Sequence, residues 1–210
     1  MLGTCDPGSP VRCSTSDDPK RKLRHTLEMI RVGRCWVGLH AAKANAVVTR
    51  MLETRAYSPF SGYGKVQREV AVEEGSRFDF RLSDHASRDE PSDPERAPCG
   101  RDVCWIEVKS VTLCEDRRAR FPDAVTQRGR RHLEHLMARV ARGERAALLY
   151  LVQRRDADSV APADDIDPEY GATLRQAIRA GVEVHALGTR VLADRIRLER
   201  VLPVLVDGGR

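Results

Sequence analysis

Three residues in two strand-like segments have the side chains needed for phosphodiester chemistry. Asp79 lies in Ser76–Leu82, and Glu107 and Lys109 lie in Val103–Leu113. Strand side chains alternate between two faces, so Glu107 and Lys109 share one face. Carboxylates bind Mg²⁺ or Mn²⁺ through oxygen, and a nearby ammonium can orient or deprotonate a water and steady a phosphate. We therefore expect all three residues to be catalytic, with Asp79 and Glu107 as ligands of Mg²⁺ or Mn²⁺.

Periodicity predicts the elements that must position these side chains. Apolar residues recur at helical spacing in three segments and form strand-like runs between them. From residue 41 the expected order is helix, three strands, helix, strand, helix, strand. We expect Phe78 and Phe80 in the core, with Asp79 pointing away from both. Pro203 places the last strand at a sheet edge. The expected helices are 41–54, one that Asp123 or Thr126 can cap and that runs to about Arg142, and 167–181. The expected strands are 65–72, 76–82, 103–113, 146–152, 182–186 and 196–205.

An Asp followed by Glu-x-Lys on the next strand is the pattern of the restriction-endonuclease-like, PD-(D/E)xK nucleases. The fold class predicted here is a mixed α/β (α+β) sheet with that core, at residues 35–210. The helix before 146–152 allows a crossover to a central strand covered on both faces. Residues 1–34, rich in Gly, Pro, Ser and Asp, predict a separate and incomplete small β unit.

Glu69 lies on the strand expected before Asp79 and is a candidate fourth catalytic residue. Its neighbours at a spacing of two are mostly polar. An exposed strand glutamate without a role explains the pattern equally well.

Composition favours a polyanionic partner. The formal net charge is +5, from 36 basic and 31 acidic residues, and the pI is about 9.0. Lys20, Arg21, Lys22 and His25 form one basic run, and we expect them to contact phosphates. A second basic region contains Arg128, in the first turns of the helix after the catalytic strands. Arg128 can reach a phosphate or pair with Asp123, and we favour the phosphate.

No apolar stretch approaches the roughly 20 residues that cross a bilayer, and the N-terminus does not resemble a secretory signal. We expect a cytoplasmic protein without a membrane partner. The six cysteines contain no CxxC pair, and we interpret them as reduced and mostly structural rather than as zinc ligands.

Each of three further side chains near the site has two possible roles. Asn45 either orders the site or caps local backbone. His132 lies in an apolar helical stripe, which favours packing or hydrogen bonding over metal binding. Trp105 shares the face of Glu107, where packing at the rim is favoured over stacking on a base.

Several long motifs carry a resemblance that covers most of the chain. The sequence resembles the sugar fermentation stimulation protein (SfsA) family. The motifs that carry the resemblance are Ser14–Lys22, His25-Thr26, Asn45, Ser61–Tyr63, Ser76–Phe80, Ile106–Leu113, Phe121–Thr126, Arg128-Gly129 and His132-Leu133.

The resemblance implies an OB-like, nucleic-acid-binding unit before a nuclease-like domain, with DNA binding and DNA/RNA nuclease activity. By position it assigns Asp79, Glu107 and Lys109 as the nuclease triad. The early barrel strands of the family are missing before Met1, which makes the OB-like unit at 1–34 partial. His40 stands where the family usually has Asn, Gln127 stands where an acidic residue is common, and the loop at 83–101 is longer than usual.

Two functions fit these sequence features. The first is a metal-dependent DNA/RNA nuclease that hydrolyses phosphodiester bonds. The second is a non-catalytic DNA-binding regulator of sugar (maltose) metabolism genes that keeps the nuclease fold. The intact triad favours the first, and the missing barrel strands favour the second. The sequence does not indicate an oligomeric state.

Overall fold

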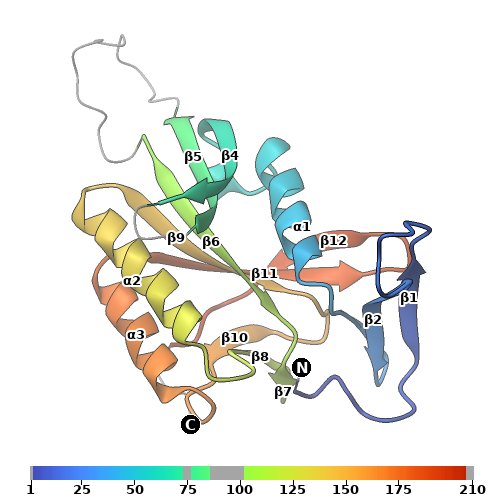
Figure 1. The fold of residues 1–210 in the computed structure, drawn as a ribbon. Coiled ribbons are helices and arrows are strands. Elements are labelled where there is room, and N and C mark those ends of the chain that lie inside the picture. Colours follow the sequence, from blue (N-terminus) through green and yellow to red (C-terminus); the bar gives the residue numbers. More distant parts are fainter. Residues whose placement is uncertain (1, 73–76, 86–101, 207–210) are drawn as a thin grey trace.

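A six-stranded mixed sheet organises the larger part of the molecule (Figure 1). The computed structural model describes residues 2–72, 77–85 and 102–206. The strand order is β12-β11-β9-β6-β5-β4. The parallel strands β6, β9 and β11 lie in the middle, and antiparallel strands flank them on both sides. The bounds are β4 (Tyr63–Ala71), β5 (Arg77–His85), β6 (Cys104–Val111), β9 (Arg145–Val152), β11 (Glu183–Val191) and β12 (Ile196–Val201).

Helices cover both faces of this sheet (Figure 1). One face packs on α1 (Ala42–Glu53), with a short 3₁₀ turn η1 (Ser58–Phe60) after it. The other face packs on α2 (Gln127–Ala141) and α3 (Pro168–Arg179). α2 connects β6 to β9 in the parallel crossover that the sequence allowed, and α3 connects β9 to β11 in a second one.

The two faces bury separate apolar clusters. Strand β9 contributes to both, and all of it after Arg145 is buried. This confirms a central strand covered on both faces. β12 lies at the edge of the sheet, in agreement with the expectation from Pro203. No helix among the described residues is long and apolar enough to cross a bilayer.

The N-terminal residues form a separate three-stranded antiparallel sheet of order β1-β2-β3. Its strands are β1 (Val11–Thr15), β2 (His25–Val32) and β3 (Cys35–Gly38). The predicted boundary at residues 34 and 35 falls inside the turn before β3. Because β3 pairs with β2 from Met29↔Gly38 to Val32↔Cys35, this sheet extends through Gly38.

A third sheet of order β10-β8-β7 was not expected from the sequence. Its strands are β7 (Cys114–Glu115), β8 (Arg118–Phe121) and β10 (Ser159–Pro162). They are four residues or shorter, too short to show a clear alternation. β7 and β8 lie in the segment that leads from β6 to α2, and β10 pairs with β8. Most of the loop expected at 83–101 lies outside the described residues, and its first three residues belong to β5.

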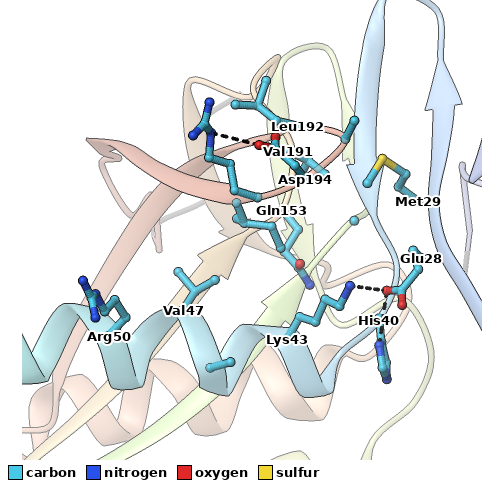
Figure 2. A pocket seen from close by; sticks show the side chains of 15 residues that line it. Glu28, Met29, His40, Lys43, Val47, Arg50, Gln153, Val191, Leu192 and Asp194 are labelled. Atoms are coloured by element: carbon cyan, nitrogen blue, oxygen red, sulfur yellow. Dashed lines mark ion pairs between the residues drawn. The ribbon is translucent and has the colours of Figure 1, made fainter. Parts of the chain in front are cut away.

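A cavity of about 400 Å³ separates the small sheet from α1 and the β11–β12 turn (Figure 2). At one end, Glu28 of β2 contacts Lys43 at 2.7 Å and His40 at 3.3 Å. Burial opposes the charge of Glu28, but Lys43 and Ser14 outweigh it and lower the pKa of this carboxyl. A backbone bond of 2.9 Å from Gly38 N to Gln153 O fixes the small sheet to the end of β9.

One carboxylate fixes the starts of both α2 and α3. Asp167 accepts from Tyr170 N at 2.9 Å, which caps α3, and from Thr126 N at 2.8 Å. Thr126 in turn caps α2 by accepting from Gly129 N at 2.9 Å. A Cβ on Gly129 would lie 3.2 Å from Tyr170, so the two helix starts approach closely. α2 therefore has a fixed position over the sheet.

We expect Asp167→Asn to lower the free energy of unfolding by roughly 1–3 kcal/mol, because a buried site then loses one acceptor and its charge. Burial opposes the charge of Asp167, but the two amide donors together with Arg130 outweigh it and lower its pKa in the folded state. The stabilisation is therefore present above the unfolded pKa of about 3.9 and is lost as the pH falls through the lower folded value. Urea unfolding at pH 7 and pH 3 checks both the loss and its shrinkage in acid.

The matched control is Asp194→Asn, because the Asp194 side chain is 68% exposed. Equal effects of the two substitutions at pH 7 would contradict the role given to Asp167.

Candidate active site

The candidate site forms where β5 separates from β6. The two strands pair at three positions, and the last of these is Phe80↔Ile106. Beyond this pair, the Asp79 side chain takes the place of a backbone acceptor of β5, because its Oδ2 accepts from Val108 N of β6 at 2.7 Å. Asp79 therefore sits in the opening between two strands rather than on a continuous sheet surface.

The same opening corrects the expected alternation of β5. Phe78 and Phe80 are both buried, as predicted, but they lie in different clusters. Phe80 packs on the α1 side, whereas Phe78 packs on the α2 side against Trp105, with ring centroids 5.3 Å apart. Strict alternation would put both rings on one face, so the prediction that Asp79 faces away from a shared phenylalanine face was wrong.

Asn45 of α1 holds the other oxygen of Asp79. Its Nδ2 donates to Asp79 Oδ1 at 2.7 Å. The neighbouring α1 residues Ala44 and Val48 are buried against the sheet, which fixes the helix that carries Asn45. The structure thus decides between the alternatives left open for Asn45: it orders the site.

Glu107 and Lys109 share one face of β6, as predicted, and Ile106 and Val108 pack on the other. Lys109 Nζ donates to Glu107 Oε1 at 2.6 Å. The Glu107 side chain is only 4% exposed and that of Lys109 is 13% exposed. The carboxylate is therefore almost out of water, and the ammonium reaches it from the accessible side.

His132 of α2 contacts the same oxygen of Glu107. Its Nδ1 lies within hydrogen-bond distance of Glu107 Oε1. On the far side of the ring, Arg128 Nε donates to His132 Nε2 at 3.3 Å. Lys109 Nζ also lies 3.3 Å from Nδ1, but its shorter hydrogen bond, at 2.6 Å, goes to Glu107 Oε1. With Arg128 donating to Nε2, we assign the ring proton to Nδ1, where it donates to Glu107. His132 thus forms a hydrogen bond, as expected from its place in the stripe.

The two carboxylates have opposite pKa shifts. Burial, and then the nearby charge of Glu107, raise the pKa of Asp79 despite its two hydrogen bonds. Burial also opposes the charge of Glu107, but the contacts with His132 and Lys109 outweigh it and lower the pKa. Glu107 is therefore held as a carboxylate, and a cation beside the pair would also stabilise the charged form of Asp79.

The donor set fits a hard divalent cation that keeps part of its water shell. Among the described residues, Glu107 Oε2 is buried without a hydrogen-bond partner, although Oε1 has two. Within the described residues no group of three or more His, Cys, Asp or Glu side chains could hold a metal. Mg²⁺ commonly takes only one or two carboxylates and fills its other positions with water and substrate phosphates. Asp79 and Glu107 would hold it here.

Glu69 remains a candidate outside this group. The β4–β5 register pairs Arg68 with Phe80 and Val70 with Phe78, so Glu69 is level with Asp79. It is exposed, has a φ of 51°, and no hydrogen bond or ion pair in the described part of the chain joins it to the cluster. The arrangement of Asp79, Glu107 and Lys109 is therefore complete without it.

The predicted phosphate-binding residues lie in two places. Lys20, Arg21 and Lys22 are exposed on the β1–β2 loop, and His25 begins β2. In Figure 1 this loop lies across α1 from α2, so it is not part of the carboxylate cluster. Arg128 is exposed at the start of α2, and its side-chain hydrogen bond goes to His132 rather than to Asp123.

Trp105 packs in the core. It is 5% exposed, and its Nε1 donates to Glu144 Oε2 at 3.0 Å. Arg139 lies over its ring at 4.3 Å from the centroid. A buried ring between a phenylalanine and an arginine has no free face for a base.

The link from Arg128 through His132 to Glu107 was missed by the sequence reasoning. The two α2 residues are four apart, which places them on one face of a helix, and this spacing was the available signal. Their contact with Glu107 joins residues 25 positions apart and depends on how α2 docks.

Comparison with known proteins settles the family. The family model described as "Sugar fermentation stimulation protein RE domain" matches residues 42–195, and "SfsA N-terminal OB domain" matches residues 1–39. The chain belongs to the sugar fermentation stimulation protein family. Proteins named sugar fermentation stimulation protein homolog include one from Desulfotalea psychrophila, 43% identical over 209 residues, and one from Rhodospirillum rubrum, 44% identical over 210 residues. These matches cover 99% and 98% of this chain and 80% and 83% of the relatives.

A solved structure shares the fold of this family member. The SfsA protein of Pyrococcus furiosus, determined in complex with Ca²⁺, matches with a TM-score of 0.80 at 24% sequence identity. The match covers 95% of this chain and 79% of that chain.

We expect Asp79→Asn to raise the stability of the metal-free protein by roughly 0.5–2 kcal/mol at pH 7. The folded pKa of Asp79 is raised, so its charged form costs stability as the pH rises from the unfolded value through the folded value. Asn keeps the shape and one acceptor for Val108 N, and Asn45 can turn its amide so that its oxygen accepts from the new NH2 group. Thermal unfolding against pH checks the sign.

The stabilisation should vanish at a pH below the unfolded pKa of Asp, where Asp79 is protonated in both states. Adding Mn²⁺ should stabilise the wild type and leave Asp79→Asn unchanged. A variant that is less stable than the wild type at pH 7 would contradict a strained carboxylate pair.

Proposed function

We propose that this protein is a metal-dependent phosphodiesterase that acts on DNA or RNA, with a restriction-endonuclease-like, PD-(D/E)xK core. The observation that carries the proposal is the state of Glu107, a nearly buried carboxylate with Oε1 held by two donors and Oε2 free. A structural ion pair has no need to leave one buried oxygen unpaired, because that costs free energy. A site for a divalent cation explains it.

The residues divide the work of hydrolysis. Asp79 and Glu107 would hold Mg²⁺ or Mn²⁺, which lowers the pKa of a bound water and offsets phosphate charge. Lys109 is partly exposed beside Glu107, where its ammonium can orient the attacking water and steady the phosphate. Asn45 and the Val108 amide keep Asp79 from turning away.

Family context supports a nucleic-acid substrate. The matched family models are described as RE and OB domains, and the solved Pyrococcus relative carries Ca²⁺, an oxygen-seeking divalent cation. Such a cation fits the two carboxylates of this site.

The basic loop supplies a second contact with the nucleic acid. Lys20, Arg21 and Lys22 are exposed, and the loop belongs to the small sheet matched by the OB model. Because this loop and α2 lie on opposite sides of α1 in Figure 1, a strand that touches both must cross the molecule. Binding should therefore need several nucleotides on either side of the cleaved bond.

We expect Asp79→Ala and Lys109→Ala to lower cleavage of labelled DNA or RNA in Mg²⁺ or Mn²⁺ by about 10²-fold or more, because each removes a group that acts in the hydrolytic step. The measurement is gel-resolved cleavage of single- and double-stranded DNA and RNA. Arg197→Ala, on the exposed edge strand β12, is the control and should cleave at the wild-type rate.

Binding of the same oligonucleotides by both variants should persist. Absence of cleavage by the wild type with retained binding would instead favour the non-catalytic DNA-binding regulator. Equal cleavage by the wild type and both variants would remove the triad from the mechanism.

We expect Lys20→Ala combined with Lys22→Ala to weaken DNA binding without changing the metal affinity. Removal of each lysine that neutralises a phosphate should lower the slope of log K against log salt by about 0.9 on duplex DNA. Fluorescence anisotropy between 50 and 200 mM salt measures the slope. An unchanged slope would show that this loop does not contact phosphates.

A further inference from the structure

Arg128 has a geometry that suits two partners at once. Its Nε donates to His132 Nε2 at 3.3 Å, and the residue is exposed at the start of α2. Among the described residues it forms no ion pair with a carboxylate, unlike Arg130 two residues on, which pairs with Glu169. The terminal guanidinium nitrogens are therefore available to a phosphate while Nε stays on the histidine.

His132 transmits the position of Arg128 to the carboxylate. Its side chain is 8% exposed, and the ring spans from Arg128 on one side to Glu107 Oε1 on the other. A donor on Nε2 favours the tautomer with the proton on Nδ1, and that proton is then directed at Oε1, which Lys109 Nζ, 3.3 Å from Nδ1, also contacts. With Oε1 held by His132 and Lys109, the carboxylate group is fixed, and Oε2 is the oxygen that has no hydrogen-bond donor among the described residues.

We infer that Arg128, His132 and Glu107 form a chain that couples phosphate binding to the metal site. A phosphate on Arg128 would restrain its guanidinium, strengthen its hold on His132, and so fix Glu107 with Oε2 ready for the cation. The inference rests on the proposed function for the metal site. It adds that His132 is a positioning residue and that Arg128 is more than a phosphate contact.

The coupling between phosphate binding and metal binding can be measured without turnover, because it is reciprocal. If bound nucleic acid tightens Mn²⁺ binding by some factor, bound Mn²⁺ tightens nucleic-acid binding by the same factor. A phosphate that touches the cation directly produces coupling in any variant. The link through Arg128 and His132 predicts an additional coupling, which is lost when either residue is replaced.

The experiment measures the Mn²⁺ dissociation constant by electron paramagnetic resonance, with and without a saturating phosphorothioate oligonucleotide. The oligonucleotide is checked for intactness afterwards. In the wild type the oligonucleotide should tighten Mn²⁺ binding by about 5–150-fold, the usual range of such couplings. Arg128→Ala should reduce this factor several-fold. Arg131→Ala is the matched control, because it removes an exposed arginine of the same helix that does not bond His132, and it should keep the wild-type factor.

Two substitutions at His132 separate positioning from packing. His132→Ala should weaken Mn²⁺ binding about 10–100-fold even without the oligonucleotide, as loss of an outer partner of a metal ligand does. His132→Asn keeps an N–H donor near the place of Nδ1 and loses the acceptor for Arg128. It should therefore restore most of the Mn²⁺ affinity but not the coupling, and adding Arg128→Ala to it should change the coupling no further.

The outcomes distinguish this inference from the proposed function. Equal coupling in the wild type, Arg128→Ala and His132→Asn would overturn the inference while leaving a metal-dependent nuclease in place. So would Mn²⁺ affinity as poor in His132→Asn as in His132→Ala, with both variants shown to be folded by thermal unfolding. Absence of Mn²⁺ binding by the wild type would overturn both proposals. Coupling that depends on Arg128 and His132, without cleavage by the wild type, would support the inference and contradict the proposed nuclease activity.

Discussion

Burial of the Glu107 carboxylate is the constraint on which the site depends. A charge almost removed from water is costly unless donors surround it. Here the sheet supplies Lys109 and α2 supplies His132, and both approach the same oxygen. Among the described residues the second oxygen, in the same buried place, has no donor. A bound cation, as proposed above, would supply the positive partner there.

This arrangement requires elements on both faces of the sheet to be placed together. Asn45 of α1 donates a hydrogen bond to Asp79 from one face of the sheet, and His132 of α2 contacts Glu107 from the other. The opening between β5 and β6 lets Asp79 take the Val108 amide in place of a ladder bond. On the α2 side, Asp167 fixes the starts of two helices and so the distance from α2 to the sheet. Small shifts at these caps would separate His132 from its carboxylate.

The sequence was sufficient for features set by local pattern. Alternation along β6 separated Glu107 and Lys109 from Ile106 and Val108, and helical spacing located α2. Neither depends on distant parts of the chain. The family motifs added the assignment to the sugar fermentation stimulation protein family, which the family models bear out.

Features set by tertiary contact were out of reach. Alternation assumes a continuous strand, so it failed at Phe78, where β5 leaves its neighbour and turns the ring to the other cluster. The link between His132 and Glu107 depends on how a helix docks on a strand 25 residues earlier, which no local spacing encodes. The short strands β7, β8 and β10 form through pairing with each other rather than through their own residue pattern.

The most direct test of the metal site is the location of Mn²⁺ in a crystal of the protein, read from its anomalous scattering. We predict one strong peak at about the 2.1 Å expected for a hard cation from Glu107 Oε2 and an oxygen of Asp79, with Lys109 and His132 still on Oε1. A cation bound elsewhere, with an ordered water on Glu107 Oε2, would contradict the claim that this carboxylate pair is a metal site.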